Sequence, residues 1–170
     1  MFGWLRNKKA EADPERGRAL YEAVRGQLGE GDDELVRIVG SVAALMLCVA
    51  YADLDVRPEE LDEVAETLRR VRGLDEQGAR AIIEVLREQT VTIAAAEATT
   101  YARELLGLTG EDFRVELLDA LIDVAAADGE ISLAETNMLR PVAVALGLTQ
   151  QHYNASQSRH RDRLAVLSSR

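Results

Sequence analysis

The sequence is poor in cysteine, proline and aromatic residues, and it has no long apolar run. Its 170 residues include 1 Cys, 3 Pro and only 4% aromatics. The single cysteine, Cys48, excludes an internal disulfide framework and fits a reducing compartment. The longest apolar run, residues 42–52, is about half of the roughly 20 residues that a membrane-spanning helix needs. No apolar signal core is visible near Met1, so we expect one cytoplasmic domain.

Charge is distributed unevenly along the chain. Lys+Arg number 20 and Asp+Glu 30, a formal net charge of -10. Residues 1–10 carry +3 and residues 155–170 carry +3, which leaves -16 for residues 11–154. Nucleic acids are bound by neutralising phosphates with Lys and Arg, so this balance predicts no nucleic-acid partner. An acidic body between two basic ends instead favours cations, a basic surface or, through the ends, an anionic membrane.

Apolar spacing predicts an all-α bundle of about 7–8 helices. Alternating β-branched runs are few, and apolar residues recur at steps of three and four. The expected helices cover about residues 14–28, 33–52, 58–72, a fourth segment capped by Asp75, then 93–106, 110–127, 132–146 and 150 into the 160s. Leu35 and Phe113 are both expected on the buried faces of their helices.

Two segments repeat at a constant offset of 75 residues, 50–60 and 125–135. Their acids align in pairs: Asp53 with Asp128, Asp55 with Glu130, and Glu60 with Glu135. Each copy follows an apolar helix and precedes an amphipathic helix that ends in Gly-Leu. The bundle is therefore expected to contain two pseudo-repeated helix-loop-helix units.

The repeated acids have two interpretations, and both stay open at this point. Three carboxylates in a loop suit a hard divalent cation such as Ca2+ or Mg2+, although the spacing is not that of an EF-hand. Alternatively, Ser132 and Glu135 form a capping box, and Pro58 with Glu60 starts the corresponding helix in the first copy. Capping explains Glu60 and Glu135 better than it explains the acids before them.

Three blocks of sequence resemble the TerB-like family, which includes tellurite-resistance TerB and the N-terminal domain of the membrane co-chaperone DjlA. They are Val49-Ala-Tyr-Ala-Asp53, then 124–132 with Glu135, and Leu-Gly-Leu148. The resemblance covers residues 33–155 and divides the chain into an N-terminal basic and aromatic segment with the first helix (1–32), the TerB-like domain (33–155) and a basic tail (156–170).

The resemblance implies an all-helical module of stress-response or membrane-associated assemblies, with no established catalysis and with acidic patches that bind divalent metal. Carried over residue by residue, the metal positions are Asp53, Asp55 and Glu60 in the first copy and Asp128, Glu130 and Glu135 in the second. Leu54 stands where the second copy has Gly129, so the first loop is expected to turn differently.

The two basic ends suggest contacts of their own. The N-terminal segment has two expected contacts: a weak one with an anionic membrane surface at the inner face, or packing on the bundle. The residues that would make either contact are Phe2, Trp4, Arg6, Lys8 and Lys9. The tail around Arg159–Arg163 either folds onto the acidic body, which is the simplest expectation, or reaches an acidic partner or a membrane. Asp119 and Asp123, one turn apart, either face Asp128 or form a solvated face.

Motifs for catalysis are missing. His152 and His160 are eight residues apart with no cysteine nearby, and no nucleophile frame, phosphate-binding glycine loop or dinucleotide motif occurs. The absence of His-Pro-Asp excludes a complete J-protein. The sequence predicts a non-enzymatic, cation-binding scaffold or sensor. The alternatives are a protein-interaction or oligomerisation module with a protein partner, itself or another, whose loops are helix caps, and thirdly a metal-dependent hydrolase.

Overall fold

A computed structural model describes residues 14–29, 32–70, 74–89 and 95–164 as a helical bundle. Its helices are α1 (Pro14–Leu28), α2 (Asp33–Ala50), α3 (Pro58–Leu68), α4 (Glu76–Gln89), α5 (Ala95–Leu108), α6 (Glu111–Ala126), α7 (Leu133–Ala145) and α8 (Gln150–Ser158), followed by the short 3-10 turn η2 (Arg161–Arg163). The all-α prediction is confirmed, and the described residues contain no strand beyond one isolated bridge. The expected N-terminal contacts of Phe2, Trp4, Arg6, Lys8 and Lys9 lie outside the described residues.

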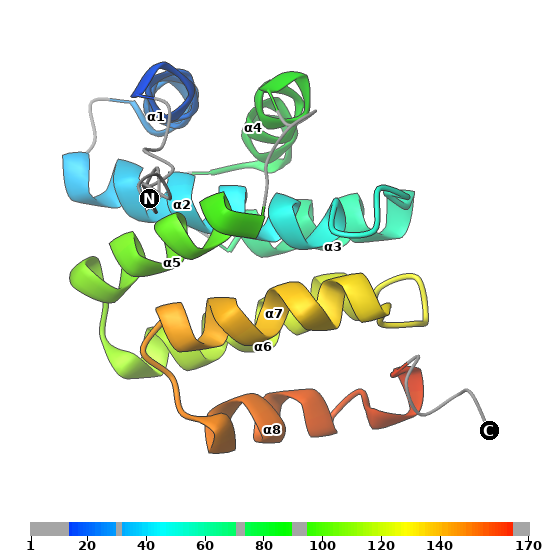
Figure 1. Ribbon diagram of the computed structural model, residues 1–170. Coiled ribbons are helices and arrows are strands. Elements are labelled where there is room, and N and C mark those ends of the chain that lie inside the picture. Colours follow the sequence, from blue (N-terminus) through cyan, green and yellow to red (C-terminus); the bar gives the residue numbers. More distant parts are fainter. Residues whose placement is uncertain (1–13, 30–31, 71–73, 90–94, 165–170) are drawn as a thin grey trace, which may run out of the picture.

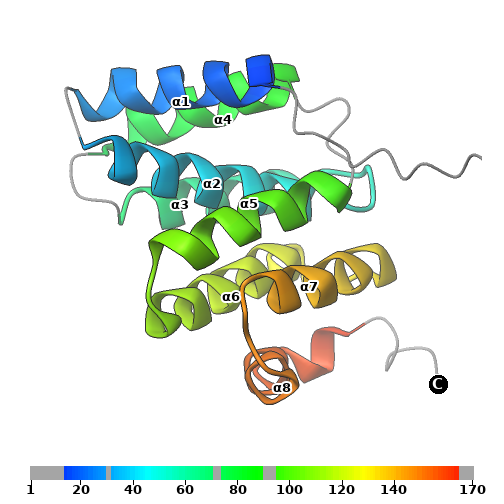
Figure 2. The ribbon, with the colours of Figure 1, turned by 60° about the vertical axis from the view of Figure 1, so that its left-hand side comes forward.

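The helices are stacked in layers. Helices α1 and α4 lie side by side at one end of the stack, α2, α3 and α5 form the next layer, α6 and α7 follow, and α8 closes the other end (Figures 1 and 2). The α2–α3 and α6–α7 turns lie at the same side of the molecule, at the right of Figure 1. The two repeated units are therefore neighbours in space as well as in sequence pattern.

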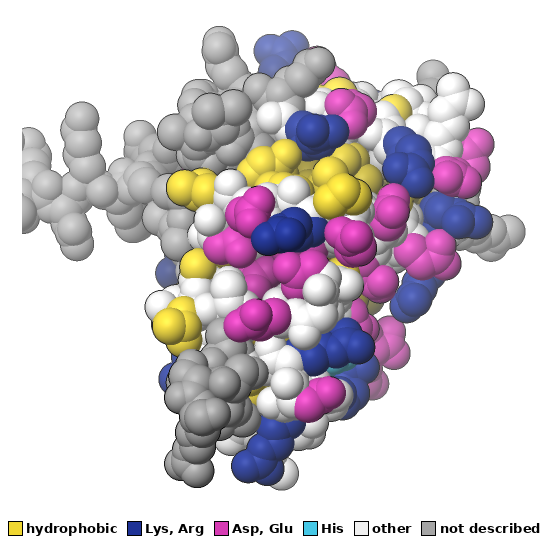
Figure 3. All heavy atoms as spheres, turned by 90° about the vertical axis from the view of Figure 1, so that its right-hand side faces the viewer, with side chains coloured by type: hydrophobic (Ala, Val, Ile, Leu, Met, Phe, Trp, Pro, Cys, Tyr) yellow, Lys and Arg dark blue, Asp and Glu magenta, His cyan; other side chains and the backbone are white. Residues whose placement is uncertain are grey.

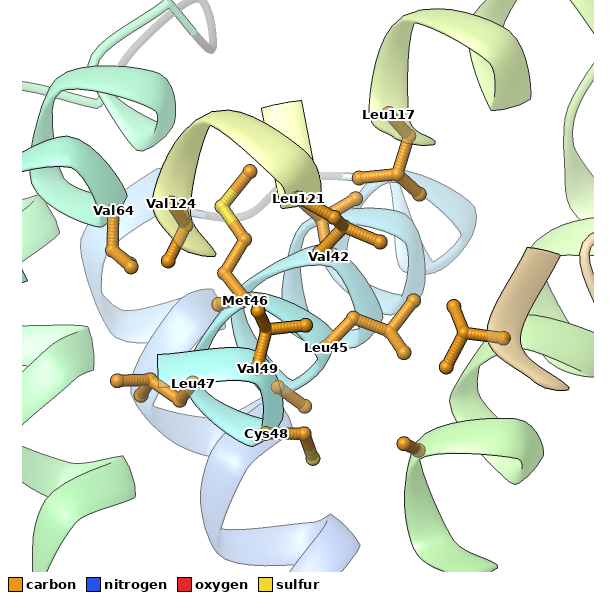
Figure 4. Packing of buried hydrophobic residues seen from close by; sticks show 14 of the residues in the cluster. Val42, Leu45, Met46, Leu47, Cys48, Val49, Val64, Leu117, Leu121 and Val124 are labelled. Carbon is orange, nitrogen blue, oxygen red and sulfur yellow. The ribbon is translucent and has the colours of Figure 1, made fainter. Parts of the chain in front are cut away.

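Helix α2 is the centre of the core because it is apolar on nearly its whole circumference. All of its residues from Val39 to Ala50 are buried. Figure 4 shows Met46 pointing toward α6, where Leu121 and Val124 lie, while Leu45 points to another side of the helix. Since the core surrounds α2, the start of the α2–α3 turn at Tyr51 is held in place by packed helix.

A polar cluster fastens α1 to the rest of the bundle. The Tyr21 hydroxyl donates to Glu104 Oε2 at 2.8 Å, Arg37 Nε donates to Glu104 Oε1 at 2.8 Å, and Ser41 Oγ donates to Glu104 at 3.2 Å. Burial raises the pKa of Tyr21, and its bond to Glu104 adds to the rise. Gly40 lies under the Tyr21 ring, where a Cβ would come within 2.9 Å. Helices α1, α2 and α5 are thus joined through one carboxylate.

Leu35 and Phe113 are not buried as expected. Their exposed fractions are 38% and 39%. Both line a groove of about 430 Å3 between α2, α3 and α6, which Val42 and Leu117 also line. The helical spacing correctly put them on the apolar faces, but no helix of the described chain covers that part of the faces. Among the described helices, none is both long and apolar enough to cross a bilayer.

Candidate functional site

The candidate site is formed by two turns that have the same backbone design. We name residues 51–57, between α2 and α3, loop 1, and residues 127–132, between α6 and α7, loop 2. In loop 1, Asp53 Oδ1 accepts from the Asp55 N–H at 2.9 Å. In loop 2, Asp128 Oδ1 accepts from the Glu130 N–H at 3.1 Å. The first acid of each copy therefore stabilises its own turn.

Leu54 does not change the turn of loop 1, contrary to the expectation from sequence. Its φ is 63°, in the left-handed region that Gly129 also occupies in loop 2 with a φ of 102°. Left-handed backbone costs a residue with a Cβ about 1–2 kcal/mol. The Leu54 side chain is 89% exposed, so no packing compensates for that cost. The repeat pattern determines the turn even where glycine is missing.

The last acid of each copy caps the helix that follows. Glu60 Oε2 accepts from the Arg57 N–H and Glu135 Oε2 accepts from the Ser132 N–H, both at 2.7 Å. Ser132 Oγ also accepts from the Glu135 N–H at 3.1 Å, which completes a capping box. A guanidinium has no acceptor, so Arg57 cannot complete the box at α3. The capping interpretation is correct for Glu60 and Glu135.

The same two glutamates also meet each other. Both are 2% exposed, and their carboxyl groups lie close enough to share a hydrogen bond. Two carboxyl groups make such a bond only if one of them holds a proton. Burial raises the pKa of Glu135 to about 8, and the bond and charge of Glu60 add to the rise. Burial also raises the pKa of Glu60. We therefore expect one proton to be held between the two copies near neutral pH.

Exposed acids surround this buried pair. Figure 3 views the molecule from the side where both loops lie and shows acidic side chains gathered across that face. The charges of Asp128 and Asp53 contribute to the raised pKa of Glu60. Asp55 forms an ion pair with Arg57 at 2.6 Å, and Glu130 is exposed. Within the described residues, no three or more His, Cys, Asp or Glu side chains are placed to hold a metal ion.

Arg57 is a site residue that the sequence reasoning missed. Its pKa is raised first by Asp55 and also by Asp128 and Asp53, so its guanidinium lies in the field of both loops. The repeat offset aligns Arg57 with Ser132. Because these two residues are unlike, the repeat did not identify Arg57 as a site residue. The contact between Glu60 and Glu135 was also missed, because spacing along the chain does not show which repeats face each other.

The basic tail folds onto the acidic body, which was the simplest of the three expectations. Arg159 Nη2 pairs with Asp119 at 3.1 Å and with Asp123 at 3.4 Å, and His160 Nε2 lies 2.7 Å from Asp123 Oδ1. Asp119 and Asp123 are therefore ion-pair partners of the tail rather than a purely solvated face. These ion pairs place the chain after α8 against α6.

The tail then fastens loop 2. The Ile131 N–H donates to the Arg163 carbonyl at 2.7 Å, and Arg163 Nη1 donates to the Ala126 carbonyl at 2.9 Å. Ile131 and Leu164 form a parallel β-bridge, with exposed fractions of only 1% and 7%. Loop 2 is therefore held from outside by a segment distant in sequence.

The family model of Tellurite resistance protein TerB matches residues 40–158. That range contains both loops, the buried carboxyl pair and helices α3 to α8, and it exceeds half of the chain. The protein belongs to the TerB family, which is a non-catalytic domain family. Searches of the curated proteins and of the solved structures give no match.

Proposed function

We propose that the protein is a non-catalytic TerB-family module that responds to divalent cations through its paired acidic loops. The observation that carries the proposal is the contact between two buried carboxyl groups, Glu60 and Glu135, at the base of both loops. A proton neutralises this pair in the absence of a cation, and a divalent cation supplies the same neutralisation with more charge.

The surrounding charges favour such an exchange. Asp53 and Asp128 already act on the pair, and the only cation among the residues of loops 1 and 2 is Arg57, which is itself paired with Asp55. Carboxylate oxygens are the donors that Ca2+ and Mg2+ prefer. Because deprotonated ligands bind metal, cation binding is expected to release the proton held by the pair.

The loops fit a divalent cation in the type of donor atom that they offer, which is carboxylate oxygen. The six acids supply enough oxygens, but the turns and caps use several of them, and no three converge in the described chain. A cation therefore has to draw exposed carboxylates of the loops, led by Asp53 and Asp128, toward it. Weak binding follows from that rearrangement, in the range of about 10 µM to 1 mM that less rigid carboxylate sites show.

Calorimetric titration of Ca2+, Mg2+ and Mn2+ into the full chain tests the proposal. Runs in two buffers of different ionisation enthalpy measure proton release, which should approach one proton per site at pH 7. The variant Asp128→Asn/Glu130→Gln should weaken binding at least about tenfold. A matched control is Glu22→Gln/Glu84→Gln, which removes the same charge from exposed positions on α1 and α4.

The absence of both heat and a melting shift at millimolar cation would overturn the proposal. Equal loss in the control variant would also contradict it, because it would reduce the effect to overall charge.

A second candidate function is protein interaction, and the groove between α2, α3 and α6 favours it. Leu35 and Phe113 are exposed there beside buried apolar side chains. The concentration dependence of mass in sedimentation tests self-association through this face. If the face self-associates, a Leu35→Asp/Phe113→Asp variant should sediment with a lower mass than the wild-type chain at the same concentration. A wild-type chain that is monomeric at all concentrations leaves no support for self-association.

A further inference from the structure

The backbone bonds of the two loops match one by one. The Ala52 N–H donates to the Val49 carbonyl at 3.0 Å as the Ala127 N–H donates to the Val124 carbonyl at 3.1 Å. The next pair behaves alike: the Leu54 N–H donates to the Tyr51 carbonyl at 3.2 Å and the Gly129 N–H to the Ala126 carbonyl at 3.0 Å. Together with the turn and cap bonds already described, this agreement makes loop 2 a direct guide to what loop 1 can bind.

Two bonds of loop 2 have no counterpart in loop 1. Val56 aligns with Ile131, yet its N–H has no acceptor among the described residues. Tyr51 aligns with Ala126, yet its carbonyl has no donor other than the Leu54 N–H within the described chain. Val56 is only partly buried, and Ile131 is 1% exposed. Within the described residues, loop 1 therefore leaves unpaired one donor and one acceptor that loop 2 has filled.

A single residue fills both positions in loop 2. The Arg163 carbonyl accepts from Ile131, and the Arg163 guanidinium donates to Ala126. Leu164, the next residue, then forms the parallel bridge and is 7% exposed. The ligand chemistry is thus an arginine at the end of a 3-10 turn followed by an aliphatic residue in extended backbone.

We propose that loop 1 is a docking site for an Arg-aliphatic segment of a partner protein, extended after its arginine and bound at Val56 and Tyr51 as the tail binds loop 2. The segment adds one parallel bridge to the loop, a small form of strand addition. Asp53 and Asp55 in loop 1 and Asp128 in loop 2 supply negative charge that complements the arginine. The exposed Leu54 side chain lies next to this site along the chain and offers apolar surface to the partner.

The tail of this chain is not the occupant. Arg163 and Leu164 are already bound to loop 2 of their own molecule, and the chain has one such tail for two loops. A tethered segment has a high effective concentration at its own site, so a second copy cannot readily supply its tail in exchange. The free position therefore fits a different chain.

The test is an NMR titration of the full, isotope-labelled chain with the capped peptide Arg-Asp-Arg-Leu-Ala, which has the sequence of residues 161–165. We expect saturable shifts of the Val56 and Leu54 amides with a dissociation constant of about 1 mM, because ordering one short peptide costs free energy. Hydrogen exchange of the Val56 amide should slow by about tenfold at saturation.

Two controls make the result specific. The peptide with its second arginine replaced by glutamine should bind at least about fivefold more weakly, since the guanidinium bond is lost. In an Arg163→Ala/Leu164→Asp chain, the guanidinium bond and the buried aliphatic contact are both lost, so the tail should leave loop 2 and the Ile131 amide should respond to the peptide as well. That response shows that the peptide can adopt the bound geometry.

Three outcomes would overturn the proposal. These are no shift in loop 1 at several millimolar peptide, shifts at Ile131 alone in the wild-type chain, and equal binding of the glutamine peptide. Shifts at loop 1 that are accompanied by displacement of a dimer would identify a second copy as the occupant and would overturn the assignment to a different chain.

Discussion

Loop 1 and loop 2 have one backbone design and two different surroundings. Both use an aspartate to hold the turn, a left-handed residue at its centre and a glutamate to cap the next helix. Loop 2 is covered by the tail, which binds its open amide and carbonyl through Arg163. In loop 1 the same groups have no partner among the described residues. The repeated pattern therefore determines shape, whereas the tail covers only loop 2 within the described part of the chain.

The two loops are nevertheless one electrostatic unit. Glu60 and Glu135 meet between them, and a charge on either loop changes the ionisation of the pair. A difference imposed on one loop is thus expected to reach the other. The variants described below either remove the difference between loop 1 and loop 2 or abolish the contact between Glu60 and Glu135 that joins them.

Truncation after Ser158 should have the largest effect, because it removes what makes loop 2 different. The chain loses burial of Leu164 and the bonds of Arg163, so we expect the free energy of unfolding to fall by about 3 kcal/mol. Denaturant unfolding at low salt measures the loss. Truncation after Leu164 is the control and should keep most of the stability. An unchanged denaturant midpoint after truncation at Ser158 would show that the tail does not hold loop 2.

Glu135→Gln should come next, because it breaks the proton link. The folded chain keeps a proton on Glu135 that the unfolded chain releases, since the pKa is about 8 rather than 4.5. Stability contributed by this group is therefore complete below pH 4.5 and is lost as pH rises toward 8. Glutamine keeps the donor to Glu60 without a titrating proton.

The Glu135→Gln chain should be more stable than wild type at pH 8 by about 2 kcal/mol, with little difference at pH 4. Thermal unfolding across this pH range measures the two curves. Glu130→Gln is the matched control, since it removes one charge from an exposed position of loop 2. Parallel pH curves for wild type and Glu135→Gln would contradict the shared proton.

The left-handed residues give a reciprocal pair of changes. A Cβ at Gly129 would meet no atom within 4 Å, so Gly129→Ala should cost only its backbone penalty, about 1–2 kcal/mol. Leu54→Gly removes the same backbone penalty but raises the conformational entropy of the unfolded chain. We therefore expect the free energy of unfolding to rise by only about 0.5 kcal/mol. Urea midpoints of both variants measure the difference. Effects of the same sign at the two positions would show that the loops do not share a turn.

Arg57→Ser gives loop 1 the cap that loop 2 has and should have the smallest effect. A serine at this position can accept from the Glu60 N–H, which typically stabilises a helix by about 1 kcal/mol. The ion pair with Asp55 is lost, but it is exposed to solvent and contributes little to stability. We expect a net gain of about 0.5 kcal/mol by chemical unfolding. Arg57→Ala is the control and should be destabilising.

Much of the fold follows from the sequence because helix patterns are local. Apolar spacing predicted eight helices, and the offset of 75 residues predicted two related loops. Leu35 and Phe113 show the limit: spacing identifies an apolar face but not whether another helix covers it. For Leu54, glycine preference argued for a different turn, yet the hydrogen bonds around the residue decided its conformation.

The site was predicted in part for a similar reason. The cap role of Glu135 follows from Ser132 three residues earlier, which is a local signal. Its contact with Glu60 depends on how two units 75 residues apart pack, and neither sequence copy contains that information. The charges of the tail correctly suggested contact with the body, whereas the bond from Ile131 to Arg163 comes from the backbone and has no residue signature.

The most direct test of the account is a pH titration of the carboxyl carbons of Glu60 and Glu135 by NMR on the full chain. We predict that one proton leaves the pair near pH 8 and that the carboxyl carbons of both residues sense it. Independent titration of both residues near pH 4.5 would contradict the claim that the two loops form one unit.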